Sequence, residues 1–386
     1  MMFLATTDNG FEYVLLDELS QLCSLRVERA FSGRLLFEAD RVEGLRALLL
    51  SRIVNNFYVL IHYVQGIESL DDIYREVKSI DFTQYIEPTQ SFAIRPERIG
   101  EHSFTSIDIA RVAGQAVIDS YMESKGVRLK VNLDNPDVEV YVELNHDRLL
   151  VALAITRESM HKRGYRVFNH PAALKTTIAA AMLRLARWKP STPIIDPMCG
   201  SGTIVIEAAL SSIRKYPICM NREWVLNHEI VTKIDPELNE FLAKICSDLD
   251  MDVPRVHLGV EINPRFVEGA SINAKFAGVD RQTLFIVGDC RHLSSLWTRI
   301  RAEIGDDIRV AVFNPPYGER MKPKDLYDLY RSVLRELYTM GIERVVFITS
   351  AIEAAEDAIY RSNYNHSERL FVIHGTLPSY VYILEL

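Results

Sequence analysis

Residues 193–203 read PIIDPMCGSGT, and residues 204–210 continue as IVIEAAL. The first three residues favour a short buried strand, the glycines favour a tight turn, and the run after Thr203 favours a helix. Because Gly200 and Gly202 have no side chain, the backbone there can come close to a ligand, and the first N–H groups of the helix point toward it. A strand, a glycine loop and a helix in this order predict a nucleotide-like cofactor at the edge of a parallel sheet.

The acid that opens this loop decides which cofactor we expect. The loop is neither the dinucleotide pattern G-x-G-x-x-G nor the phosphate loop G-x-x-x-x-G-K, since no lysine follows Gly202. Asp196 would repel a polyphosphate, whereas it would attract the sulfonium and ammonium charges of S-adenosylmethionine (SAM). The loop therefore predicts a SAM site.

Two later strand ends also carry carboxylates, in the order that such a sheet needs. Glu261 and Asp289 each end an apolar run. We expect Glu261 to accept both ribose hydroxyls and Asp289 to accept from the adenine amino group. Glu261 follows Gly202 by far more than the roughly twenty residues usual in such sheets. The stretch 211–254 is therefore predicted to be an insertion, helical and partly covering the cofactor edge.

The strongest indication of chemistry is the motif NPPY at residues 314–317, which follows the apolar run 310–313. A planar exocyclic amine has its lone pair delocalised into the ring, so a methylating enzyme must hold its two N–H hydrogens on acceptors. Asn314 Oδ1 and the Pro315 carbonyl can be those acceptors, and Tyr317 offers an aromatic face to an unstacked base. The two prolines remove competing N–H donors and stiffen the loop. The motif predicts methylation of a planar amine, with Asn314, Pro315 and Tyr317 as catalytic residues.

Each motif also has a purely structural interpretation. Asn-Pro-Pro occurs as a turn after a strand, and a lone acid such as Glu261 is commonly a solvated charge. Asp196, Glu261, Asp289 and Asn314 nevertheless follow one another in the order of a nucleotide-binding sheet. Their joint presence favours the functional interpretation over the structural one.

These motifs together resemble the Rossmann-like, SAM-dependent RNA methyltransferases that carry an N-terminal THUMP domain. The segments that carry the resemblance are 196–203, 259–261, Asp289, 314–320, 92–95, 100–106, 135–140, 161–166 and 170–174. Within this family the chain is most similar to the tRNA guanine-N2 methyltransferases that act at position 6 of the acceptor stem. Ribosomal-RNA guanine-N2 methyltransferases of the same architecture share these motifs and resemble the chain nearly as closely.

The resemblance implies a methyl transfer from SAM to the N2 of a guanosine in structured RNA. The cofactor-binding residues that it implies are Asp196, Met198, Cys199, Gly200, Ser201, Gly202, Thr203, Glu261, Asp289, Cys290 and Asn314. The same NPPY chemistry also serves adenine N6 and protein glutamine, although the THUMP-like half favours RNA. A non-enzymatic RNA-binding module with a vestigial methyltransferase domain is disfavoured, because all the motifs occur together.

The chain is expected to be an α/β protein of several domains, since 386 residues exceed the size of one core. The predicted segments are a ferredoxin-like unit at 1–65, a THUMP domain at 66–156, a basic linker at 157–170 and a Rossmann-like methyltransferase domain at 171–386. We expect a doubly wound, mostly parallel sheet in the last segment. By family analogy its final strand, near 379–384, is antiparallel.

Basic residues gather where the two halves join. Residues 157–189 carry eight basic side chains and one acid, although the whole chain has a net charge of −8. Such a run is often only a solvated helix face, but its position between the halves favours RNA. The residues expected to contact phosphates are Arg95, Arg98, Lys162, Arg163 and Arg166. Because no aromatic and basic residues alternate, we expect RNA shape rather than base sequence to set specificity.

Composition excludes several other classes. The most apolar stretch, 48–64, is interrupted by polar residues and is too short to span a bilayer, and residues 1–10 lack the basic start of a signal peptide. The cytoplasm is therefore the expected compartment. The five cysteines form no C-x-x-C pair, which argues against a zinc site or a disulfide framework, and no metal is expected. Cys199 and Cys290 are expected to be small packing residues near the cofactor.

Overall fold

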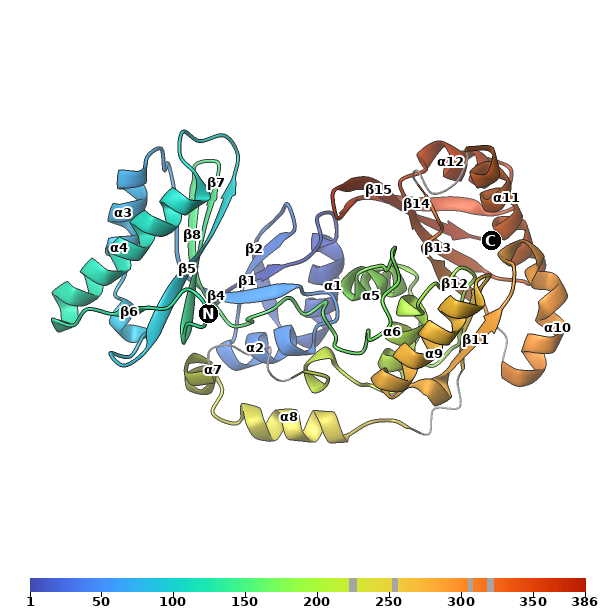
Figure 1. Ribbon diagram of the computed structural model, residues 1–386, viewed down its shortest axis with the longest axis horizontal. Helices are drawn as coiled ribbons and strands as arrows, with labels where there is room; N and C mark the ends of the chain where they lie inside the picture. Colours follow the sequence, from blue (N-terminus) through green and yellow to red (C-terminus); the bar gives the residue numbers. More distant parts are fainter. Residues whose placement is uncertain (222–227, 252–255, 305–307, 318–322) are drawn as a thin grey trace.

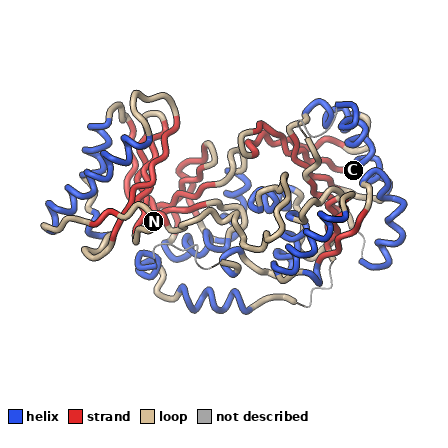
Figure 2. Tube along the Cα trace, in the orientation of Figure 1, coloured by secondary structure: helices blue, strands red, loops and turns tan. Residues whose placement is uncertain are grey.

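The computed structural model describes residues 1–221, 228–251, 256–304, 308–317 and 323–386, and it contains two large sheets (Figures 1 and 2). The first sheet is built from residues 2–154 and the second from residues 194–385. Figure 1 shows the two sheets side by side along the long axis of the molecule. In the part of the chain described, no helix is long and apolar enough to cross a membrane.

The N-terminal half is one continuous sheet with the strand order β2-β3-β1-β4-β8-β7-β5-β6. Its strands are β1 (Met2–Thr6), β2 (Leu25–Phe31), β3 (Arg34–Ala39), β4 (Asn56–Gln65), β5 (Ser91–Ile99), β6 (Lys130–Val131), β7 (Val138–Asn145) and β8 (Arg148–Ala154). Its helical segments are α1 (Glu12–Leu22), α2 (Arg41–Leu50), α3 (Leu70–Lys78), η1 (Phe82–Gln84) and α4 (Ser106–Lys125). Because β4 pairs with β1 on one side and with β8 on the other, the segments expected at 1–65 and 66–156 share a sheet.

Local sequence explains where the helices of this half begin and end. Thr105 and Asp108 form a reciprocal capping box at the start of α4, which satisfies two N–H groups that the helix leaves unpaired. The helix ends at Gly126, whose φ of +67° favours glycine. α3 begins with the same type of capping box, formed by Ser69 and Asp72.

The second sheet has the order β11-β10-β9-β12-β13-β15-β14. Its strands are β9 (Ile194–Asp196), β10 (His257–Glu261), β11 (Thr283–Val287), β12 (Val310–Phe313), β13 (Arg344–Thr349), β14 (Asn365–His374) and β15 (Leu377–Glu385). Strands β9 to β13 pair in parallel, and β15 is antiparallel to both β13 and β14. The expectation of a mostly parallel sheet with an antiparallel last strand is confirmed, and β15 lies inside the sheet rather than at its edge.

Helices cover both faces of this sheet, as a doubly wound fold requires. The helical segments of this half are α5 (Thr176–Leu185), α6 (Thr203–Ser212), η2 (Pro217–Cys219), α7 (His228–Ile234), α8 (Leu238–Ser247), α9 (Pro264–Ala277), η4 (Asp280–Gln282), η5 (Cys290–His292), α10 (Leu293–Ile304), α11 (Pro323–Thr339) and α12 (Ile352–Tyr360). Along β13, Val345 belongs to the core formed with α10, α11 and α12, while Val346 belongs to the core formed with α5 and α6. Successive side chains point to opposite faces, and residues 345–348 of β13 are all apolar because both faces are covered.

In the described part of the insertion between α6 and β10, no residue lines the predicted cofactor site, so the expectation that this part covers the cofactor edge is wrong. Its helices α7 and α8 lie against the N-terminal half instead (Figure 1). Arg46 of α2 donates to both carboxylate oxygens of Asp235, at 2.7 and 3.0 Å, and Lys233 pairs with Glu87 at 3.1 Å. The insertion is therefore a strap that joins the two halves; its residues 222–227 and 252–255 lie outside the described part.

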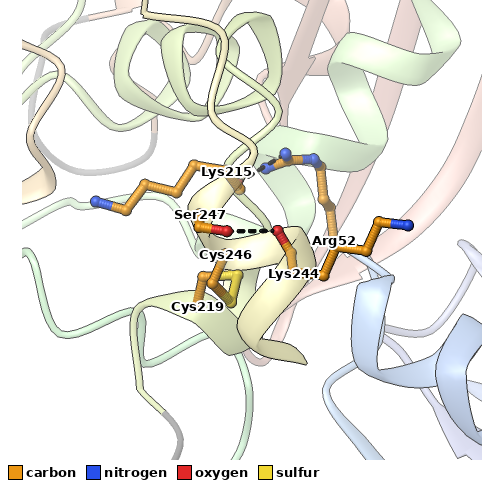
Figure 3. The surroundings of a disulfide bond; sticks show 6 residues. All are labelled: Arg52, Lys215, Cys219, Lys244, Cys246 and Ser247. Atoms are coloured by element: carbon orange, nitrogen blue, oxygen red, sulfur yellow. Dashed lines mark hydrogen bonds between the residues drawn. A yellow bond between two sulfur atoms is a disulfide. The ribbon is translucent and has the colours of Figure 1, made fainter. Parts of the chain in front are cut away.

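A disulfide at the base of this strap contradicts the expectation that no cysteines are paired. Cys219 in η2 is bonded to Cys246 in α8, with their Cα atoms 5.3 Å apart (Figure 3). Beside it, the Arg52 guanidinium donates to the Lys215 carbonyl at 2.8 Å. The two cysteines are 27 positions apart, a spacing without any signature, so only the packing of η2 on α8 brings them together.

Candidate active site

A cavity of about 1270 Å³ opens at the carboxyl ends of β9, β10 and β12. This is where ligands bind in open α/β sheets, because the loops after parallel strands converge there. The predicted residues that line the cavity are Asp196, Met198, Cys199, Gly200, Ser201, Thr203, Glu261, Asp289, Cys290, Asn314, Pro315 and Tyr317. The structure thus brings together residues that are more than a hundred positions apart.

The glycine loop needs its two glycines for different reasons. Gly200 has a φ of +52°, and Gly202, with a φ of +83°, is the N-cap of α6. A Cβ on Gly202 would lie 2.9 Å from the ring of Phe285, so only glycine fits there. Gly202 is the one predicted cofactor residue that does not line the cavity; it shapes the loop.

Asp196 and Glu261 place two carboxyl groups at one end of the cavity. Asp196 is buried, and desolvation together with the charge of Glu261 raises its pKa well above the usual aspartate range. Its Oδ1 accepts one backbone hydrogen bond, from Met198, at 3.0 Å. Glu261 accepts from the Gly200 N–H at 3.1 Å and from the Asn263 N–H at 2.9 Å. Two acids in such a desolvated place suit a cationic ligand.

Asp289 already has partners on its own loop. Its carboxylate accepts from the Arg291 guanidinium at 3.0 and 2.5 Å and from the Arg291 N–H at 2.9 Å, which lowers its pKa. The next residue, Cys290, and Cys199 of the glycine loop are both buried, and burial raises the pKa of each thiol, to about 12 for Cys290. Both therefore remain neutral thiols at physiological pH, as packing residues would.

The NPPY loop leaves one acceptor without a partner. Asn314 Oδ1 is buried and has no hydrogen-bond donor among the described residues. An unsatisfied buried oxygen of this kind is costly, by about 1–3 kcal/mol, and its presence in a cavity points to a ligand donor. Asn314 Oδ1 thus lies where the motif requires an acceptor. Residues 318–320, which also carry the family resemblance, lie outside the described part.

Two residues that support this loop were not predicted from the sequence. The Tyr330 hydroxyl of α11 lies 3.4 Å from the Pro316 carbonyl oxygen and 2.7 Å from Thr349 Oγ1. The Tyr317 hydroxyl lies 2.7 Å from Nδ1 of His374, at the end of β14. No local pattern marks either residue, because their contacts join segments far apart in the sequence.

The basic residues expected to contact RNA are mostly engaged with the protein. Arg163 is wholly buried, 3.5 Å from Glu207, and it donates to the carbonyls of Met160 and Arg52, so its side chain does not lie on the expected phosphate surface. Two of the others form ion pairs, Arg95 with Glu139 and Lys162 with Glu158. The remaining two donate hydrogen bonds to backbone carbonyls, Arg98 to Gly100 and Arg166 to Leu174. Lys162 is exposed, and its pair with Glu158 is long, at 3.5 Å. Each of these basic side chains therefore has a partner within the protein, and within the basic run Arg163 is paired with a distant acid.

Among the described residues, no group of three or more histidines, cysteines and acids could hold a metal ion. The cavity suits SAM: it has a glycine loop, the buried Asp196 and the partly exposed Glu261 for its positive charges and hydroxyls, and an acceptor on Asn314 without a partner among the described residues.

Comparisons with known proteins agree with this geometry. Residues 163–379 match the RMKL-like methyltransferase domain and residues 68–154 match the THUMP domain. The tRNA (guanine(6)-N2)-methyltransferase of Methanocaldococcus jannaschii is 38% identical and aligns over 100% of both chains. The enzyme of the same name from Archaeoglobus fulgidus is 38% identical over 97% of this chain and 90% of its own. The ribosomal RNA large subunit methyltransferase K/L of Vibrio campbellii is 28% identical over 83% of this chain, which spans only 44% of that relative.

Solved structures share the fold over the whole chain. The crystal structure of SMU.472, complexed with SAH, has a TM-score of 0.82 at 22% identity and covers 100% of this chain and 97% of that one. TrmN from Thermus thermophilus has a TM-score of 0.72 at 22% identity, with 100% and 99% covered.

Proposed function

Since this chain belongs to the RMKL-like methyltransferase family and carries a THUMP domain, we propose that it is a SAM-dependent tRNA (guanine(6)-N2)-methyltransferase. It transfers a methyl group to the exocyclic N2 of a guanosine, most specifically at position 6 in the tRNA acceptor stem. The two full-length relatives with 38% identity bear this activity in their names, and the ribosomal-RNA relatives are more distant.

The Asn314 side chain supports this proposal independently of the family relationship. Asn314 Oδ1 is a buried acceptor without a donor among the described residues, and it lines the cavity together with Pro315 and Tyr317. A guanine N2 amine has two N–H donors, one for Asn314 Oδ1 and one for the Pro315 carbonyl. Held in this way, the nitrogen points toward the methyl donor.

The residues that line the cavity have different roles in the proposed reaction. Bound SAM supplies an activated methyl group on a sulfonium, a leaving group that needs no acid. Asp196 would face the positive charges of the cofactor, Glu261 would accept from the ribose hydroxyls, and Cys199 and Cys290 would pack against it, since all four residues line the cavity. Asn314 and Pro315 orient the N2 amine, and Tyr317 stacks the base after it swings out of its helix. Alignment and exclusion of water then supply most of the acceleration of a direct in-line transfer.

The N-terminal half and the basic linker supply the RNA-binding surface in this proposal. We keep four exposed or half-buried basic residues as phosphate contacts, namely Arg95, Arg98, Lys162 and Arg166, and we assign Arg163 a structural role because it is buried. The domain limits at 1–65, 66–156, 157–170 and 171–386 are part of the same proposal. Since tRNA is its substrate, we propose the cytoplasm as its compartment.

Labelling identifies the substrate directly. Purified protein is incubated with radiolabelled SAM and a mixture of unmodified tRNA transcripts and ribosomal-RNA fragments, and the labelled RNA is digested to nucleosides. We expect label in N2-methylguanosine at position 6 of tRNA. Label confined to ribosomal RNA would keep the chemistry and change the substrate, and label in neither would contradict the proposal.

A further inference from the structure

The hydroxyl of Tyr317 is held by an imidazole from a distant part of the chain. The Tyr317 oxygen lies 2.7 Å from His374 Nδ1, and the two ring centroids are 6.4 Å apart with a 69° angle between the planes. Both side chains line the cavity. Their contact is therefore a hydrogen bond at the edge of the tyrosine ring and not a stacking contact between the two rings.

His374 is fixed by the backbone around it. It is the last residue of β14, opposite Leu377 of β15 across the turn at Gly375. The preceding residue, Ile373, donates its N–H to the Asn9 carbonyl of the N-terminal half at 3.0 Å. The strand thus holds the imidazole between two sheets, and its position does not depend on the NPPY loop.

The loop that carries Tyr317 is tethered from the other side as well. The Tyr330 hydroxyl lies within 3.4 Å of the Pro316 carbonyl oxygen, and it is anchored by Thr349 Oγ1 at 2.7 Å. One contact holds the backbone just before Tyr317, and the other holds the end of its side chain. Two contacts at different points leave the ring little freedom to rotate.

The charge state of the imidazole suits an acceptor. Burial and the nearby Lys175 lower the pKa of His374, which Asp8 partly offsets, so the ring is neutral at physiological pH. With its proton on Nε2, a neutral imidazole offers Nδ1 to the phenol hydroxyl.

We propose that His374 is a positioning residue for methyl transfer, which fixes the Tyr317 ring by accepting its hydroxyl so that the target base stacks on a preset surface. This inference rests on the proposed function, in which Tyr317 stacks the guanine. When a base docks on a ring that is already fixed, the tyrosine side chain loses less entropy than when docking itself must order the ring.

A double-mutant cycle tests the pair. Single-turnover methylation rates at saturating tRNA are compared for the wild type, Tyr317→Phe, His374→Phe and the double variant. Loss of one hydrogen bond is worth about 1 kcal/mol, or roughly fivefold. We expect each single change to lower the rate by about that factor and the double variant to be no slower than either, because both remove the same contact.

Two further variants separate positioning from general damage. His374→Asn keeps an acceptor in place of Nδ1 and should recover most of the rate, while His366→Phe, an exposed site on the same strand, should match the wild type. Calorimetry should show unchanged SAM affinity in all five variants. Melting curves check that each protein is folded. If His374→Phe is unfolded, the rates of Tyr317→Phe and His374→Asn still test the proposal.

The outcomes distinguish this inference from the function on which it rests. A wild type that methylates tRNA and an Asn314→Ala variant that does not would support the proposed function. With that result, a wild-type rate in His374→Phe would overturn the positioning role alone. A double variant whose rate loss is the product of the two single losses would also overturn it. A wild type that methylates no RNA overturns the proposed function and this inference together.

Discussion

Glu261 Oε2 accepts a hydrogen bond from the Gly200 N–H at 3.1 Å, so the acid at the end of β10 holds the glycine loop at the end of β9. Its other oxygen accepts from the Asn263 N–H at 2.9 Å. These two contacts fix the orientation of the carboxylate, and each oxygen retains a lone pair for a hydroxyl of the ribose. The same side chain thus shapes the loop and lines the cavity in which we propose that SAM binds.

Glu261→Ala should weaken SAM binding while leaving RNA affinity largely intact. Hydrogen bonds to a charged group contribute about 1.5–3 kcal/mol each, so we expect a loss of about 10- to 100-fold in affinity, measured by titration calorimetry. Glu268→Ala removes an exposed acid from the helix that follows and should change nothing. An unaltered SAM affinity in Glu261→Ala would refute the assigned role.

Asn314→Ala should lower the single-turnover methylation rate by about 10² or more, the loss typical of one well-placed polar group at a transition state. The variant removes an oxygen that has no structural partner among the described residues, so its melting temperature should not fall. Asn363→Ala, at an exposed asparagine, is the matched control. A folded Asn314→Ala protein with a normal rate would be incompatible with our mechanism.

SAM affinity should rise with pH through the raised pKa of Asp196. Below that pKa the ligand-free protein holds Asp196 as a neutral acid, because burial and the Glu261 charge disfavour the carboxylate. The cationic cofactor favours the ionised form, so binding releases a proton, and affinity should fall by up to about tenfold for each pH unit below the pKa. Calorimetry in buffers of different ionisation enthalpy measures the released proton. In Asp196→Asn this dependence should disappear.

Arg163→Ala should destabilise the fold by about 3–5 kcal/mol, because it removes the buried guanidinium that lies 3.5 Å from the buried Glu207 carboxylate. Denaturant unfolding measures the change in free energy. The donations from Arg163 to Met160 and Arg52 would be lost as well.

Lys162→Ala is the neighbouring control for this prediction. Its exposed pair with Glu158 should contribute less than about 1 kcal/mol to stability. If Lys162 contacts a phosphate, the same variant should weaken tRNA binding and reduce the slope of log affinity against log salt by about 1. A large loss of stability in Lys162→Ala and none in Arg163→Ala would reverse our assignment.

Cys219→Ser should lower the free energy of unfolding by about 3 kcal/mol, since the disulfide closes a chain segment of 27 positions. The measurement is denaturant unfolding under oxidising conditions. Cys23→Ser, at a free cysteine, should have little effect. A strong reductant should remove the difference between the wild type and Cys219→Ser; a difference that persists would point to packing instead.

Local patterns predicted much of the fold. Strand β9, helix α6 and strand β15 lie where the run 193–195, the run after Thr203 and the run 379–384 indicated them, because apolar runs and the flanking glycine turn define such elements. The cavity could be predicted for a similar reason. Each of Asp196, Glu261 and Asn314 directly ends or follows an apolar strand, and parallel strands bring their carboxyl ends to one edge.

Contacts between distant segments could not be predicted in this way. The sequence shows Arg163 as one member of a basic run, and only the tertiary structure encloses it beside Glu207. The Cys219–Cys246 bond likewise depends on how η2 packs against α8. His374 reaches Tyr317 from 57 positions away, through a strand pairing that no local pattern encodes.

The interior position of β15 has a consequence for the order of folding during synthesis. β15 pairs with β13 on one side and with β14 on the other, yet it is the last of these strands to leave the ribosome. The catalytic sheet therefore cannot be completed until β15 emerges, and His374 reaches its final place only then. All eight strands of the first sheet precede residue 155, so that half can form its hydrogen bonds earlier. We expect nascent chains to acquire the RNA-binding half before they acquire the ability to methylate.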